Sequence, residues 1–342
     1  MRFATGFISA DHFRYPAVRY RGRNWHILFG PQSVGIPTIN SHVGRRVIPA
    51  KEVFITAKSE RIARAVASNI VGAMVLLQGS SVLIPELTDA IELHEIAGLR
   101  GMDEVRSAAA EVRRLYVGHW STDDFPLACR IASRVTHSLS LQYAVSKFRL
   151  STESASFHFA DLDPNNSDII PRWHRAEDHV RLATAIVLAY SVIEELGLEV
   201  RASNQKPSSI NGHWNPDVKH ELEIRLARAG IDFSNPVVWS IRGGRSRLEA
   251  ARPGHLFATT KRTPWTRWNV RDRLVDVVDA IGHASFLRSR VSSHRLRPDL
   301  ARMLSAYDVS NVQLLARRLF LAKLGYWPQY TMLKRAYQPK AH

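Results

Sequence analysis

The sequence predicts a mainly α-helical protein in which an N-terminal region, mixed α/β or irregular, precedes a C-terminal helical bundle. After residue 59, apolar residues recur every three to four positions through long segments, as along one face of a helix. Two of these segments stop at Gly197 and Gly230, and glycine is common just past a helix end. Residues 1–57 instead place β-branched and aromatic residues between Gly and Pro, which is typical of short strands and turns.

The length of 342 residues predicts two compact units, because it exceeds the size of one ordinary domain core. With 45% hydrophobic and 23% charged residues, the composition excludes extensive disorder. Residues 155–171, ASFHFADLDPNNSDIIP, lack a sustained period and are rich in Asp, Asn and Pro, as linkers are. We therefore expect an N-terminal domain at 1–155, a linker at 156–174 and a helical bundle at 175–330.

The elements of the first domain follow from local patterns. RYRGRNWHILFG at 19–30 and RRVIPAKEVFIT at 45–56 predict strands. Ser59 is expected to cap a helix that continues to Gln78, since its apolar residues keep a three- to four-residue spacing. Two further helices are predicted at 85–115 and 125–150.

The second domain is predicted to consist of helices and one charged insertion. Residues 176–200 have the most regular helical spacing in the chain and end at Gly197. The basic segment 241–268 contains too much Gly and Pro to predict a regular element. The remaining helices are predicted at 218–229, 271–286, 298–305 and 309–324.

Several classes of protein are excluded or disfavoured by the sequence. Asp11 and other polar residues near the start interrupt any signal peptide, so we expect a soluble, cytoplasmic protein. The apolar stretch 65–84 holds four polar residues and predicts a buried helix followed by a short strand rather than a membrane span. The one cysteine, Cys129, excludes disulfides and is expected to be a small buried apolar residue. No metal-binding spacing and no Gly-rich nucleotide loop occurs, so no cofactor is predicted.

The positive charge is concentrated near the C-terminus. Residues 241–342 hold 20 Lys and Arg against 6 Asp and Glu, which gives +14 of the formal net charge of +16. Arg dominates this count, and its planar fork matches phosphate geometry. The distribution predicts a phosphate-rich polymer as partner, although a well-solvated basic surface is the alternative.

Arg288 and His294 form the pair most suited to chemistry. Six positions along a continuous helix advance by roughly 600°, so the two side chains would converge only where the helix ends or bends. Ser292 and Ser293 before His294, followed by Pro298, are where such a break is expected. The alternative is that the pair caps a helix end and forms ion pairs with Asp299 or Glu194.

Two segments resemble the HEPN superfamily of helical-bundle ribonucleases. LRSRVSSH at 287–294 is similar to the family's Arg-x(4–6)-His motif, here with five intervening residues where four is more usual. LAYSVIEELGLEVR at 188–201 resembles the aromatic and acidic end of the family's first long helix. The resemblance covers about residues 175–327, and it implies metal-independent RNA cleavage by a homodimer that shares one cleft.

The resemblance also implies roles for individual residues. His294 would act as general acid or base, since its ordinary pKa lies near neutrality. Arg288 would hold the phosphate, with Glu194 orienting one member of the pair or forming a purely structural ion pair. Further contacts to RNA are expected from Arg290, Arg295 and Arg297, and secondary contacts from Arg242, Arg245, Trp265 and Trp268.

The function expected from these features is that of an endoribonuclease, of the kind found among toxins and phage-defence effectors. The N-terminal domain would bind a regulatory protein or nucleic-acid partner. Two alternatives remain: a helical protein that binds nucleic acid without cutting it, and a scaffold whose basic face binds an acidic protein. For Trp265 and Trp268, ordinary packing is the alternative to base stacking.

Overall fold

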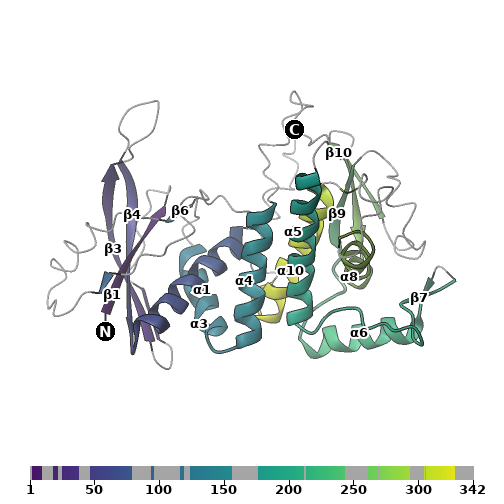
Figure 1. Ribbon diagram of the computed structural model, residues 1–342, viewed down its shortest axis with the longest axis horizontal. Coiled ribbons are helices and arrows are strands. Elements are labelled where there is room, and N and C mark those ends of the chain that lie inside the picture. Colours follow the sequence, from purple (N-terminus) through teal and green to yellow (C-terminus); the bar gives the residue numbers. More distant parts are fainter. Residues whose placement is uncertain are drawn as a thin grey trace. The chain divides into compact units, whose positions relative to one another are not determined.

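The computed structural model contains two compact units, Met1–Arg149 and Leu150–His342, and the division falls within one helix, α4 (Leu139–Ser154). The protein is mainly helical, as predicted (Figure 1). The predicted linker at 156–174 lies outside the described residues, so its extent stays a prediction. The structure describes residues 2–9, 18–21, 25–37, 47–78, 94–95, 116–118, 124–155, 176–211, 213–242, 261–267, 270–292, 304 and 306–327.

The N-terminal unit contains a six-stranded sheet with the order β2-β3-β4-β1-β5, and β6 also pairs with β1. All neighbours are antiparallel except β1 and β6, which are parallel. The strands predicted at 19–30 and 45–56 are therefore confirmed. The strands are β1 (Arg2–Ser9), β2 (Val18–Arg21), β3 (Trp25–Pro37), β4 (Val47–Ala57), β5 (His94–Glu95) and β6 (Tyr116–Gly118).

The prediction of a helix at 85–115 is wrong for residues 94–95, which are the part of this range that the structure describes. His94 and Glu95 form β5 and pair with Ala4 and Phe3 of β1. The strand β6 pairs with the later residues of the same β1 edge. Two short segments thus satisfy the backbone groups of one strand edge, a long-range demand that outweighs local helical spacing.

The helices of this unit are α1 (Glu60–Gln78), α3 (Asp124–Val135) and the first part of α4. Ser59 caps α1 as predicted, because its Oγ accepts the Ile62 N–H at 3.4 Å. The single helix predicted at 125–150 is instead two helices. Ser138 provides a new cap, accepting the Leu141 N–H at 3.4 Å, so a second helix begins there.

The C-terminal unit contains most of the predicted helices. Gly197 and Gly230 follow helix ends with φ of 72° and 70°, which confirms both glycine stops. Asn215 caps α6, where its Oδ1 accepts the Asp217 N–H at 3.1 Å. The helices are α5 (Ala176–Glu195), α6 (Pro216–Arg228), α8 (Val277–Phe286), the π-helical turn η4 (Leu287–Ser292) and α10 (Ala306–Lys323).

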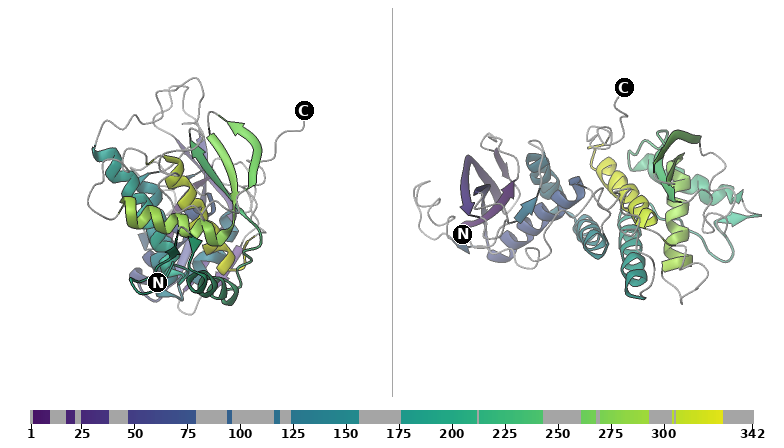
Figure 2. Two further views of the ribbon diagram at one scale, coloured as in Figure 1. Left: turned by 90° about the vertical axis from the view of Figure 1, so that its right-hand side faces the viewer. Right: turned by 90° about the horizontal axis from the view of Figure 1, so that it is seen from above.

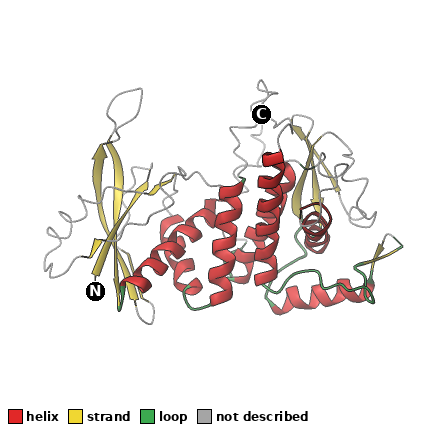
Figure 3. Cartoon of the chain, viewed as in Figure 1, coloured by secondary structure: helices red, strands yellow, loops and turns green. Residues whose placement is uncertain are grey.

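The prediction that this unit is built from helices alone is wrong. It contains an antiparallel sheet with the order β10-β11-β9 and a short hairpin of β7 and β8 (Figure 3). The predicted insertion at 241–268 contributes to two of these strands, and the helix predicted from 271 begins only at Val277. The strands are β7 (Ser209–Ile210), β8 (His213–Trp214), β9 (Val237–Arg242), β10 (Lys261–Arg267) and β11 (Val270–Val275).

The helix α10 organises the core of the C-terminal unit, where it packs against α5 and β9 (Figure 2). Its Asn311 side-chain amide forms two hydrogen bonds to the backbone of Ser240 in β9: it accepts the Ser240 N–H at 2.9 Å and donates to the Ser240 carbonyl at 2.8 Å. This contact satisfies backbone groups on the β9 edge. The helix α10 therefore fixes α5 and the sheet within one core.

Candidate functional site

Glu194 in the last turn of α5 forms an ion pair with Arg288 near the start of η4. Arg288 Nη2 lies 3.2 Å from Glu194 Oε1. The structure thus brings together two of the three residues predicted as catalytic, from segments about ninety positions apart in the sequence. The ion pair with Glu194 is also the contact that the structural alternative predicts for Arg288. Their side chains are 39% and 33% exposed, so water screens the pair. An ion pair this exposed contributes about 0–1 kcal/mol, and stability alone explains it poorly.

The Glu194 carboxylate is held by its own helix. Ser191, three residues earlier, donates its hydroxyl to Glu194 Oε2 at 3.1 Å. Each carboxylate oxygen therefore has a separate partner. Arg288 Nε is buried, so a phosphate would reach the guanidinium through its Nη groups.

Tyr190 lies beneath Arg288, one helical turn before Glu194. Its ring centroid is 6.0 Å from Arg288 Cζ, within the range of a cation–π contact. Its hydroxyl accepts the Val200 N–H at 3.1 Å and is hydrogen-bonded to the Ser285 hydroxyl. Burial raises the pKa of the Tyr190 hydroxyl above its ordinary value, so the phenol stays neutral over the physiological range.

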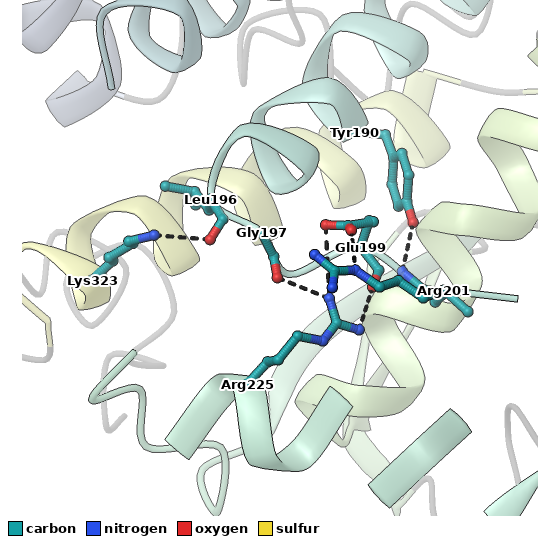
Figure 4. A network of polar contacts seen from close by, with 8 residues as sticks. Tyr190, Leu196, Gly197, Glu199, Arg201, Arg225 and Lys323 are labelled. Atoms are coloured by element: carbon teal, nitrogen blue, oxygen red, sulfur yellow. Dashed lines mark hydrogen bonds and ion pairs between the residues drawn. The ribbon is translucent and has the colours of Figure 1, made fainter. Parts of the chain in front are cut away.

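Three cationic side chains fix the chain that follows α5 (Figure 4). Arg225 from α6 donates to the carbonyls of Gly197 and Glu199 at 2.8 and 2.7 Å. Lys323 from α10 donates to the Leu196 carbonyl at 2.8 Å, and Arg201 pairs with the Glu199 carboxylate at 2.6 Å. Positive charge at a helix C-terminus satisfies open carbonyls and complements the helix dipole. The end of α5 is therefore a rigid support for Glu194.

The helix α8 continues into the π-helical turn η4 up to Ser292, and the break expected from there to Pro298 lies outside the described residues. A π turn closes through i→i+5 hydrogen bonds and holds one residue more than an α turn. The Ser289 hydroxyl donates to the Ser285 carbonyl at 2.7 Å, a contact that bends helices. Arg288 lies within this turn, whereas His294 lies outside the described residues.

The other predicted contact residues are less fully described. Arg290 belongs to η4, Arg242 ends β9, and Trp265 lies in β10. In the sheet, Arg242 and Arg267 are both register partners of Val270. Outside the described residues lie Arg245, Trp268, Arg295, Arg297 and Asp299.

Sequence reasoning missed a buried polar group on α8. Asp279 is 3% exposed and accepts the Trp214 indole N–H at 2.8 Å. His283, one turn later, is fully buried with its ring centroid 5.3 Å from that of Trp239. A polar i, i+4 pair inside an otherwise apolar helix was the available signal. Its contacts tie the β8 hairpin and β9 to α8, which is a structural role.

Part of the C-terminal positive charge is used inside the fold. Arg318 is 5% exposed and donates to the carbonyls of Pro236 and Asn235, while Trp327 covers its guanidinium. Burial lowers the pKa of Arg318 below its ordinary value. Arg317 is also buried. The charge available to a polyanion is therefore smaller than the sequence count implies.

Cys129 is fully buried and not in a disulfide, as predicted. Burial raises the pKa of its thiol far above the ordinary value, so the thiolate that nucleophilic chemistry requires does not form. Among the described residues, no three His, Cys, Asp or Glu side chains gather in a way that would hold a metal ion. In the same part of the chain, no helix has the length and apolar character needed to cross a membrane.

Comparison of the chain with protein-family models, with curated proteins and with solved structures finds no match.

Proposed function

We propose that the C-terminal unit is a metal-independent endoribonuclease of the HEPN type, acting on cytoplasmic RNA as a toxin or phage-defence effector. The observation that supports this proposal best is the Arg288–Glu194 pair at 3.2 Å. It joins the two segments on which the resemblance rests, and its arginine lies within a π turn, an element common at functional sites.

In the proposed reaction, the 2′-hydroxyl oxygen of a ribose attacks the adjacent phosphorus, and the bond from phosphorus to the 5′-oxygen breaks. His294 exchanges a proton during this step, either taking it from the 2′-hydroxyl or giving it to the leaving 5′-oxygen. Arg288 binds the non-bridging phosphate oxygens and stabilises the charge that develops on them. The products are a 2′,3′-cyclic phosphate and a 5′-hydroxyl end, which balances atoms and protons.

The test compares the wild-type protein with His294→Ala on single-stranded RNA in EDTA. We expect cleavage by the wild type and a loss of about 10²–10⁴-fold in the variant, the usual contribution of a general acid or base. Arg288→Ala should lose activity as well. Equal cleavage by wild type and His294→Ala, or cleavage by neither, would overturn the enzyme proposal.

A second candidate, a protein that binds nucleic acid without cutting it, is favoured by the charge alone. The exposed part of the positive charge in residues 241–342 would neutralise phosphates in either case. Binding that weakens steeply with salt, without cleavage, supports this candidate. Binding that is insensitive to salt contradicts both nucleic-acid functions and favours an acidic protein partner for the basic face. In each case the N-terminal unit would recruit a regulatory protein or nucleic acid.

A further inference from the structure

Tyr190 connects every segment that positions Arg288. Through its hydroxyl it contacts Val200, in the chain after α5, and Ser285, in the last turn of α8. Ser285 in turn accepts the Ser289 hydroxyl of η4 through its carbonyl. A single phenol thus links α5, the segment that Arg225 and Arg201 fix, and the helix that carries Arg288.

The ring of Tyr190 also faces the guanidinium directly. Tyr190 and Glu194 are i, i+4 neighbours, so they lie on the same face of α5. Glu194 contacts Arg288 Nη2 at 3.2 Å, while the Tyr190 ring centroid lies 6.0 Å from Arg288 Cζ. A carboxylate and an aromatic face then restrict the guanidinium from two directions, while 39% of the side chain stays exposed to a ligand.

We propose that Tyr190 is a positioning residue for Arg288, holding the guanidinium where it receives a phosphate of single-stranded RNA. This role rests on the proposed function. Tyr190 acts through Arg288 and does not touch the reacting atoms. Tyr190 is 2% exposed, and a buried tyrosine hydroxyl ordinarily finds a hydrogen-bond partner, as this one does at the Val200 N–H. The observation that points to a positioning role is that the ring anchored in this way lies 6.0 Å from Arg288 Cζ.

The central experiment is a double-mutant cycle with Tyr190→Phe and Arg288→Ala. The substitution Tyr190→Phe keeps the aromatic ring and removes only the hydroxyl. The first readout is the affinity for a 2′-O-methyl oligoribonucleotide, which cannot be cut by 2′-hydroxyl attack. We expect Tyr190→Phe to weaken binding by about three- to tenfold when Arg288 is present and to have no effect beside Arg288→Ala. Additive effects would overturn the positioning role.

Tyr143→Phe is the matched control. Tyr143 lies in the N-terminal unit, is 54% exposed, and also has a cation near its ring, since Lys147 Nζ is 6.0 Å from the centroid. The Tyr143→Phe substitution should change neither the affinity for RNA nor its cleavage. Thermal unfolding followed by circular dichroism verifies that each variant is folded. If Tyr190→Phe fails to fold, Ser285→Ala removes the contact between Tyr190 and Ser285 from the other side.

The second readout, the kinetics of RNA cleavage, tests the positioning role of Tyr190 separately from the proposed endoribonuclease function. In a cleaving protein, Tyr190→Phe should lower kcat more than it raises KM, because misplaced charge stabilisation acts mainly in the transition state. If the wild type binds the 2′-O-methyl RNA but does not cut ordinary RNA, the enzyme function fails and the affinity cycle still decides on Tyr190. If the wild type binds no RNA, both are overturned.

Discussion

At the residue scale, the candidate site depends on the two contacts of the Glu194 carboxylate, one at each oxygen. Ser191 occupies Glu194 Oε2, and Arg288 faces Oε1. Replacing Glu194 with Gln keeps the shape of the side chain and removes the charge that attracts the guanidinium. The arginine would then sample more orientations, and fewer of them would suit a phosphate.

We therefore expect Glu194→Gln to lower RNA cleavage by about three- to tenfold, with little change in unfolding temperature because the pair is exposed. The measurement is the initial cleavage rate together with a thermal melt. Glu60→Gln is the control, since Glu60 forms an exposed i, i+4 pair with Arg64 in the N-terminal unit. Equal effects of the two substitutions on cleavage would contradict an orienting role for Glu194.

Tyr190 makes a separate prediction about pH. Its pKa is raised in the folded protein, mainly by burial, so the folded state keeps its proton where the unfolded chain loses it. Stability due to this group is thus fully present below the ordinary tyrosine pKa of about 10 and declines as pH rises above it. The difference in free energy of unfolding between the wild type and Tyr190→Phe, measured in urea, should decrease between about pH 9 and pH 11. A difference that stays constant or grows would show that the phenol is not buried as described.

At the level of elements, η4 offers an explanation for the spacing of the Arg-x(5)-His motif. One residue more fits in a π turn than in an α turn. If the resemblance holds, a π turn between Arg288 and His294 would let five intervening residues take the place of the more usual four.

Deleting Ser292 should consequently convert η4 to an α turn and leave cleavage within a few-fold of wild type. Inserting one alanine after Ser292 lengthens the segment between Arg288 and His294 by one residue without a compensating change of turn. We expect the cleavage rate to fall by about 100-fold because the two side chains are then misplaced. The measurement is the cleavage rate of both variants after a melting curve has shown that they fold. If the deletion is as damaging as the insertion, the π turn does not set the spacing.

Gly72 shows a different constraint, the close approach of α1 and α4. A Cβ at this position would lie 2.1 Å from Val145 Cγ1, and Val145 is β-branched and 2% exposed. Gly72→Ala gains helix propensity of about 1 kcal/mol, but overpacking costs about 1–3 kcal/mol. We expect a net loss of stability in urea unfolding that Val145→Ala relieves in the double variant. Independent effects of the two substitutions would contradict this contact.

The helices whose ends carry local signals could be predicted from sequence. Ser59, Gly197 and Gly230 mark ends that the structure confirms. The strands β10 and β11 could not, because their Arg-rich sequences have no clear period of two and their pairing is a long-range choice. Arg288 was singled out with His294 by their spacing around an expected helix break, and the resemblance then added their catalytic roles. The role of Tyr190 depends on its ring contact with Arg288, 98 positions away, which no spacing reveals.

On the scale of the whole molecule, the charge count and the fold must be considered together. Arg317 and Arg318 are buried, and Lys323 donates to the Leu196 carbonyl, so these cations support the fold. Arg288 is different because its side chain remains 39% exposed. A charge excess that is partly internal cannot by itself concentrate RNA along one face, which gives the individual exposed arginines more weight in the proposed function.

One Arg288 and one His294 per chain provide half of the cleft that the proposed homodimer would share. If the active pair combines Arg288 of one chain with His294 of its partner, each single variant alone is inactive. Refolding Arg288→Ala together with His294→Ala then yields mixed dimers that hold one intact pair across the two chains. We expect the mixture to regain up to about a quarter of the wild-type rate, given random pairing into dimers that are half mixed and hold one of two pairs. The measurement is RNA cleavage after co-refolding, with each variant refolded alone as control. Activity of the mixture no higher than that of the separate variants would place the complete site within one chain or remove the dimer from the mechanism.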